Sequence, residues 1–265
     1  MISKDDLKRL AGEKGLNVSS LSKDYALGWL LFGISKSSVA DKLVFKGGTA
    51  LSKIYFPENW RLSEDLDFTI LDAKTELDSI ISALENEVPS IIQKENGMGV
   101  VLKDRPHTNI GYLQSRFQYT GPLGKDTIKI EISREEIIGE SKIEKVPRVF
   151  DYPNFEIRVY SLEDILAEKI RSMIQRKRIR DYYDVWRLLK ERKFDNKKVK
   201  NLFLEKCKSK KITFTGIEQF FPSDIVQMLE PYMEKGLTRL SREPLPPLQN
   251  IIDKLKISMN FLNED

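Results

Sequence analysis

The chain has 265 residues and a net charge of +4, and 40% of its residues are hydrophobic, which allows one large or two modest domains with a real core. One cysteine, Cys207, excludes an intramolecular disulfide and a cysteine-cluster zinc site, and one histidine, His107, excludes histidine-based metal sites. Carboxylates must therefore carry any metal chemistry. The polar N-terminus and the short apolar runs predict neither a signal peptide nor a membrane span, and a reducing cytoplasm is the expected compartment.

The first 160 residues mix helical and strand patterns. The spacing of apolar residues predicts, in order, two or three helices over 3–42, a strand over 43–45 that feeds a glycine turn and a helix ending at 55, a strand over 65–71, an amphipathic helix over 75–94, three strands over 99–103, 110–119 and 127–133, and a short strand over 155–160. The strict alternation in 127–133 is typical of a half-buried strand.

The pattern changes to helices at Ser161, which precedes Asp164 by three residues as in a capping box. From there helices are expected to the end of the chain, with breaks near residues 177, 194, 211, 222 and 244–247. We therefore predict an α+β fold with one domain over 1–160 and a helical domain over 161–265.

Asp65 and Asp67 are the first candidates for metal ligands. In a strand, residues two apart project to the same face, so both carboxylates point together while Leu66 and Phe68 face the core. Mg²⁺ is typically held by one or two carboxylates and by substrate phosphates. Two solvated aspartates on an edge strand are the alternative, although aspartate is depleted in strands.

Glu131 is the candidate for a third carboxylate. It lies in the alternating strand and shares a face with Lys129. A two-metal phosphoryl-transfer site needs such a carboxylate from a neighbouring strand, so the assignment depends on this strand lying beside Asp65 and Asp67. An exposed glutamate beside an exposed lysine is the alternative.

A glycine pair follows the first predicted strand in the segment Lys46-Gly47-Gly48-Thr49. Glycines let the backbone approach a phosphate, and a helix N-terminus offers free N–H groups. The segment is neither a P-loop nor a dinucleotide fingerprint. A Gly-Gly turn alone is more often a plain connection, but the nearby Asp-Leu-Asp strand strengthens a phosphate-binding interpretation.

A basic cluster lies in the helical part, around Lys169 and from Arg171 to Arg180, and is followed by tyrosines. Such a cluster suits triphosphate or RNA phosphate and bases. A solvated helical face is the usual alternative for a charge run, and Asp181 and Asp184 could simply pair with neighbouring arginines.

Taken together, these residues resemble the four motifs of the AbiEii/AbiGii nucleotidyltransferase toxins of type IV toxin–antitoxin and abortive-infection systems, to which the mycobacterial MenT toxins are similar. The matching segments are Lys46-Gly-Gly-Thr-Ala-Leu-Ser, Arg61-x-Ser63-x-Asp65-Leu-Asp67-Phe, Ala167-Glu-Lys169-Ile and Arg180-Asp181-x-Tyr183-Asp184. The resemblance spans about half the chain, and the four motifs occur in the expected order.

The resemblance implies a DNA polymerase β-like nucleotidyltransferase core, a small mixed sheet flanked by helices, followed by a helical C-terminal lobe that completes an active-site cleft. Its implied roles are nucleotide binding by Lys46, Gly47, Gly48, Thr49, Ser63 and Arg180; metal binding by Asp65 and Asp67; phosphate contact by Lys169; and an essential acid, a candidate base for the incoming hydroxyl, at Asp181. The assignment of Glu131 as a third metal ligand depends on strand periodicity more than on a motif.

The implied reaction is Mg²⁺-dependent transfer of a nucleoside monophosphate from an NTP to a hydroxyl, with Mn²⁺ as an alternative ion. The family implies a tRNA acceptor end, a block of translation, and a separate DNA-binding antitoxin repressor that need not form a stable complex with the toxin. Two alternatives stay open: a kinase-like or aminoglycoside-modifying phosphotransferase on the same core, and an inactive nucleotide- or RNA-binding module.

Overall fold

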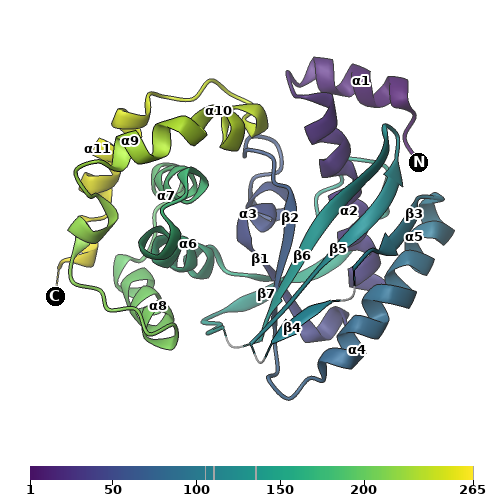
Figure 1. Cartoon of the computed structure of the whole chain (residues 1–265), viewed down its shortest axis with the longest axis horizontal. Helices are drawn as coiled ribbons and strands as arrows, with labels where there is room; N and C mark the ends of the chain where they lie inside the picture. Colours follow the sequence, from purple (N-terminus) through teal and green to yellow (C-terminus); the bar gives the residue numbers. More distant parts are fainter. Residues whose placement is uncertain (105, 110, 135, 265) are drawn as a thin grey trace. The chain divides into compact units, whose positions relative to one another are not determined.

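The structure is a computed structural model that describes residues 1–104, 106–109, 111–134 and 136–264. The chain divides into two compact units (Figure 1). The first comprises Met1–Glu135 and Ser141–Tyr160, and the second comprises Glu136–Glu140 and Ser161–Asp265. Across the described residues, no helix combines the length and the apolar character needed to cross a membrane.

The first unit begins with two helices, α1 (Lys4–Glu13) and α2 (Val18–Lys36), as the apolar spacing predicts. The side chains of Ser3 and Asn17 cap them by accepting hydrogen bonds from first-turn N–H groups. The next helix is α3 (Gly47–Ala50), which continues as a π-helical turn over Leu51–Tyr55. It is followed by α4 (Leu77–Ser82) and α5 (Val88–Asn96), and a π-helical turn over Ala83–Glu87 joins these two helices.

A mixed sheet forms the centre of the first unit (Figure 1). Its strands are β1 (Leu43–Lys46), β2 (Asp65–Ile70), β3 (Gly99–Leu102), β4 (His107–Asn109), β5 (Tyr112–Gly121), β6 (Gly124–Ser133), β7 (Ser141–Lys145) and β8 (Glu156–Tyr160). The strand order is β3-β5-β6-β2-β1-β8-β7, and β4 also pairs with β5. β2 runs antiparallel to β1 and parallel to β6, which brings the predicted aspartate strand and the Glu131 strand side by side.

The sheet has one apolar face and one polar face around β2. Leu66 and Phe68 are fully buried, and the ring of Phe68 packs against that of Phe45 on β1 at 5.2 Å between centroids. Helices α2 and α5 contact the strands on the covered side. Because side chains alternate along a strand, Asp65 and Asp67 point to the opposite face.

Most predicted strands are confirmed, with small shifts at their ends. The strand expected over 110–119 is β5, which begins at Tyr112 and continues to Gly121; Ile110 lies outside the described residues. Two short strands, β4 and β7, were not expected. Both are polar, and β7 contains a single apolar residue, Ile143, so neither carries the alternation that identifies a strand in a sequence.

The second unit is helical, as predicted. Its main helices are α6 (Leu162–Arg176), α7 (Ile179–Glu191), α8 (Asn196–Ser209), α9 (Ile225–Leu229), α10 (Met233–Gly236) and α11 (Leu248–Ser258). The expected helix start is confirmed, since the Ser161 hydroxyl accepts a hydrogen bond from the Asp164 N–H at 3.1 Å. α6 ends at Arg176, and the residue that follows, Lys177, has φ +39°.

A buried ionic cluster attaches residues 136–140 to this unit. Asp164 accepts hydrogen bonds from the backbone N–H groups of Gly139 (2.9 Å) and Glu140 (2.7 Å). Lys206 lies 3.1 Å from the same carboxylate and donates to the Ile137 carbonyl at 2.6 Å. Asp164 and Lys206 are both fully buried, so the charge of each must be compensated by the charge of the other.

Candidate functional site

The glycine turn and the aspartate strand are in direct contact in the first unit. Gly47 has φ +78°, a conformation that favours glycine, and a Cβ atom placed on it would lie 2.4 Å from Asp67 Oδ2. The register pairs Lys46 with Asp67. Glycine is therefore required at position 47 both for its backbone conformation and because the Asp67 carboxylate occupies the space of a side chain.

Two residues just before β2 also pack against the turn. A Cβ atom on Gly48 would lie 3.0 Å from Arg61 Nη2 and 3.2 Å from Ser63 Oγ. The Thr49 hydroxyl donates a hydrogen bond to the backbone carbonyl of Asp65, and its side chain is fully buried. The Thr49 side chain thus holds the turn to the start of β2, which leaves the backbone as the part of this residue able to contact a ligand.

Helix α3 begins directly at the glycine pair. Among the residues that the structure describes, no side chain caps its first turn. Lys46, the residue before it, is buried, and its ammonium lies 5.7 Å from the centre of the Tyr160 ring. An uncapped first turn beside a carboxylate pair suits a phosphate that arrives together with a cation.

Glu131 lies beside the aspartates, as the strand assignment required. The parallel register of β2 and β6 pairs Asp67 with Glu131 and Asp65 with Lys129. This register makes Asp67 and Glu131 cross-strand neighbours on the polar face of the sheet. Both aspartates are partly exposed.

Two neighbours keep Glu131 ionised. The Tyr112 hydroxyl donates a hydrogen bond to it, and the Lys129 ammonium lies 3.2 Å away. Burial raises the pKa of Glu131, but the Tyr112 hydrogen bond and the charge of Lys129 outweigh it and leave the pKa below its usual value. The pKa of Tyr112 is raised, mainly by burial and then by the contact with Glu131. The charges of Asp67 and Asp65 raise it further, so Tyr112 keeps its proton.

The donor set matches the chemistry of Mg²⁺. Asp65 and Asp67 supply the one or two carboxylate ligands that this ion takes together with substrate phosphates, and Gly47 brings backbone to the same place. Within the described ranges, no group of three or more His, Cys, Asp or Glu side chains is already arranged to hold a metal ion. The assignment of Glu131 as a third ligand therefore stays a prediction.

The predicted residues of the second unit form an ionic cluster between α6 and α7. The Lys169 ammonium lies 3.1 Å from Asp181 Oδ1 and 2.9 Å from Asp184 Oδ2. Arg176 donates from Nε and Nη2 to the two oxygens of Asp181, at 2.8 and 3.0 Å. Asp181 and Asp184 are 1% and 0% exposed. Two carboxylates thus hold one lysine at a defined position.

The pKa of Asp181 bears on its role. Burial raises this pKa, but the charges of Lys169 and Arg176 and the hydrogen bonds from both side chains lower it to about 2. At neutral pH Asp181 is therefore ionised and a weak base.

The two other predicted residues of the last motif make structural contacts. Arg180 donates from Nε to the carbonyl of Gly236 at 2.8 Å, which attaches the start of α7 to α10. The Tyr183 hydroxyl accepts a hydrogen bond from Arg187 at 2.7 Å, and its ring is buried.

Sequence reasoning missed Tyr112 and Arg176 as partners of the candidate residues. Tyr112 reaches Glu131 through the register of β5 and β6, and Arg176 reaches Asp181 across the turn between two helices. Neither contact has a signal in a single sequence, although the basic run around residue 176 marked the right region.

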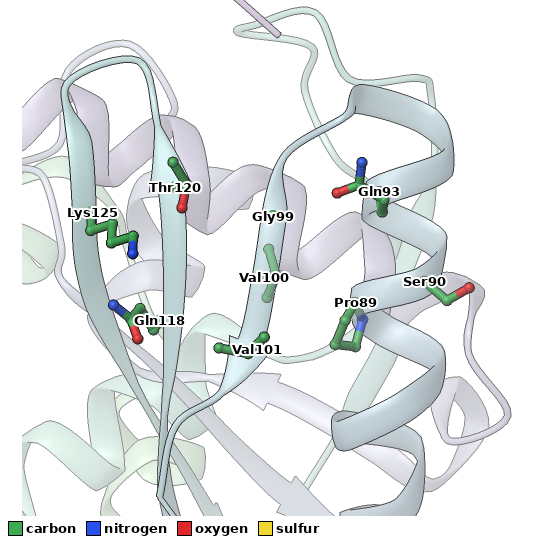
Figure 2. Close-up of a pocket in the computed structure, with 9 residues that line it drawn as sticks. All are labelled: Pro89, Ser90, Gln93, Gly99, Val100, Val101, Gln118, Thr120 and Lys125. Atoms are coloured by element: carbon green, nitrogen blue, oxygen red, sulfur yellow. The ribbon is translucent and has the colours of Figure 1, made fainter.

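A separate cavity of about 510 Å³ lies in the first unit between α5, β3 and the β5–β6 hairpin (Figure 2). Its lining residues are Pro89, Ser90, Gln93, Gly99, Val100, Val101, Gln118, Thr120 and Lys125. None of the predicted site residues lines it, and Lys125 is its single titratable group, so we assign no chemistry to it.

Comparison with known proteins identifies relatives. A family model described as the nucleotidyl transferase AbiEii toxin of a type IV toxin–antitoxin system matches residues 29–254. The fold is similar to that of MenT4, a nucleotidyltransferase toxin from Mycobacterium tuberculosis H37Rv, with a TM-score of 0.75 and 20% identity over 100% of this chain and 91% of that one. JHP933 from Helicobacter pylori is similar with a TM-score of 0.55 and 18% identity over 94% of each chain. None of the curated proteins matches the sequence.

Proposed function

The chain belongs to the AbiEii family of nucleotidyltransferase toxins of type IV toxin–antitoxin systems, and we propose that it transfers a nucleoside monophosphate from an NTP to the hydroxyl at a tRNA 3′ end and so blocks translation. The bond between the α-phosphorus and the bridging oxygen to the β-phosphate breaks, the acceptor oxygen bonds to the α-phosphorus and gives up its proton to water, and pyrophosphate leaves. Such an enzyme would act in the cytoplasm.

The contact between Gly47 and Asp67 is the observation that carries this proposal. It brings the glycine turn and a carboxylate to one place, and this arrangement would suit a triphosphate with its cation. Asp65 and Asp67, with Glu131 as a third ligand, would hold Mg²⁺ or Mn²⁺, which when bound neutralises phosphate charge and lowers the pKa of the attacking hydroxyl.

The remaining candidates have roles that follow from their contacts. The backbone of Gly47 and Gly48 would contact the phosphates, with Lys46, Ser63 and the backbone of Thr49 nearby. Lys169 would add positive charge at the leaving pyrophosphate, where negative charge accumulates. Asp181 and Asp184 would hold the Lys169 ammonium in place, and Arg180 would support the start of α7.

The family implies an antitoxin partner. We propose that it is a separate DNA-binding repressor that opposes the toxin without forming a stable complex.

Labelled triphosphates test the reaction. Incubation with total RNA, Mg²⁺ and each NTP should place the α-phosphate label, and not the γ-phosphate label, on RNA of tRNA size. Label transfer from the γ-phosphate would indicate kinase chemistry instead, and labelling of protein or small molecules alone would refute the RNA acceptor.

Matched variants test the residues. Asp67→Asn and Asp65→Asn should each abolish transfer and leave the fold unchanged by circular dichroism, because an amide is a poor ligand for a hard cation. Asp78→Asn is the control, since Asp78 is an exposed aspartate on α4. Full transfer and full growth inhibition by either site variant would refute this assignment.

A further inference from the structure

Positive charge is concentrated in one stretch of the second unit. Residues 171–211 contain 16 basic and 5 acidic side chains, a net charge of +11, whereas the other 224 residues contain 28 basic and 35 acidic side chains and carry −7. The modest net charge of the whole chain therefore hides a strongly basic segment. Such a segregated charge is the usual footprint of a polyanion-binding surface.

The structure separates the basic residues that stabilise the fold from those that face solvent. Arg176 is paired with Asp181, Lys206 with buried Asp164, and Lys210 with Glu136 at 3.0 Å. The exposed lysines Lys193, Lys197, Lys208 and Lys211, here called the α8 lysine face, form no ion pair within the described part of the chain. Their charge is therefore available to a partner.

Helix α8 presents two of these lysines on one side. Its buried side, formed by Val199, Leu202, Phe203, Lys206 and Cys207, belongs to the core, and α8 packs on α6 (Figure 1). Lys197 and Lys208 are eleven residues apart, which is about three helical turns, so both project from the same side at about 16 Å along the axis. Lys193 precedes the helix and Lys211 follows it.

The surface next to these lysines combines apolar and charged groups. A depression of about 540 Å³ runs beside Lys197 and is lined by Asn201 among others. Of its carboxylates, Glu140 is paired with the Lys198 ammonium at 2.7 Å, and Asp195 accepts a hydrogen bond from the Lys198 N–H at 3.1 Å. Glu205 is the third carboxylate there.

We propose that the α8 lysine face binds the phosphate backbone of RNA. Spaced, exposed lysines suit phosphates, whose contacts position a nucleic acid without reading its sequence. Protein interfaces are instead depleted in lysine and rich in aromatic residues, and the single exposed apolar residue on this side of α8 is Leu204. A membrane surface would need the apolar side of α8, which is buried against the fold.

This inference rests on the proposed function, because it supplies the RNA acceptor with a binding surface. Its test measures binding alone, without NTP or divalent ion. Total tRNA is titrated against the wild type and against a variant in which Lys193, Lys197, Lys208 and Lys211 are all glutamine, from 50 to 300 mM KCl. The association constant K falls as salt rises, so the slope of log K against log salt is negative. Each lost phosphate contact makes this slope shallower by about 0.7 to 0.9, so the slope of the variant should be shallower than that of the wild type by about 3.

The control variant replaces four exposed lysines of the first unit, Lys8, Lys14, Lys74 and Lys94, with glutamine. It removes the same net charge and should change the slope by less than about 1. Equal slopes for the wild type and the α8 variant, equal losses in both variants, or no RNA binding by the wild type would each overturn the proposal. Loss of binding to an acidic protein with unchanged RNA affinity would assign this surface to a protein partner and would overturn it as well.

The two proposals fail in different ways. If the wild type binds tRNA through the α8 lysine face but places no α-phosphate label on RNA, the proposed reaction is wrong and the surface stands. If RNA is labelled while the α8 variant binds it with the wild-type slope, the reaction stands and the surface is wrong.

Discussion

Replacing Gly47 with alanine should damage the site far more than the fold. The φ of +78° at this position costs an L-residue about 1–2 kcal/mol. Gly97 provides a matched control, because it has φ +76° at the end of α5 and a Cβ atom there would meet nothing within 4 Å. Gly47→Ala and Gly97→Ala should therefore lower the free energy of unfolding by similar amounts.

The difference between the two variants comes from Asp67. The new Cβ atom at position 47 would lie 2.4 Å from Asp67 Oδ2, whereas ordinary contacts begin near 3.4 Å. The carboxylate must therefore move by roughly 1 Å, and a displacement of that size in a catalytic constellation costs about 100-fold in rate. Gly97→Ala should keep transfer close to that of the wild type.

The assay is transfer of α-phosphate label to RNA, with each rate divided by the folded fraction from urea denaturation. A further comparison is the concentration of Mg²⁺ at half-maximal rate, which should rise in Gly47→Ala and not in Gly97→Ala. If both variants lose the same activity per folded molecule, Asp67 does not depend on the turn and the reasoning from the contact is refuted.

Two further predictions concern the buried charges of the second unit. Asp181→Asn should lower the free energy of unfolding at pH 7 by about 2 kcal/mol, because the pKa of Asp181 falls from 3.8 to about 2 on folding. A carboxylate whose pKa is lowered on folding stabilises the fold at pH values above its pKa in the unfolded chain. The difference in free energy of unfolding between wild type and variant should therefore be constant above pH 5 and shrink as the pH falls from 4 through 2. Exposed Asp224→Asn is the control, and a difference that persists at pH 2 would contradict the linkage. Lys206→Met should lower the free energy of unfolding by about 3–5 kcal/mol, because it leaves buried Asp164 without its cation. The control is the exposed Lys208→Met, which should lower it by less than about 0.5 kcal/mol in urea denaturation. Equal losses in the two variants would show that the buried pair does not hold the unit together.

The candidate site of the first unit was predictable because its chemistry is local in sequence. Asp65 and Asp67 share a face through the period of a strand, and a glycine pair after a short strand predicts a turn into a helix. Their contact depends on the pairing of β1 with β2, and the approach of Glu131 depends on β6 lying parallel to β2. Strand order is a property of the whole fold, so one sequence could state the Glu131 assignment only as a condition.

The candidate residues of the second unit were predictable by motif and not by physics. A lysine at 169 and an aspartate at 181 are twelve residues apart, and only the packing of α6 on α7 brings them to 3.1 Å. The same packing adds Arg176 and Asp184, which the sequence presents as ordinary members of a charged run. Burial turns that run into a defined cluster, and burial cannot be read from charge alone.

The cluster also bears on the two roles that can be proposed for Asp181. A general base is most effective when its pKa lies near the working pH, because it must be both unprotonated and able to accept a proton. A carboxylate with a pKa of about 2, held by Lys169 and Arg176, accepts a proton poorly. It is, however, well suited to hold the Lys169 ammonium at one position. Its attraction offsets the conformational entropy that the long lysine side chain loses when it is fixed. We therefore favour Asp181 as the residue that positions the Lys169 ammonium, so that loss of either partner should disrupt the same ionic cluster.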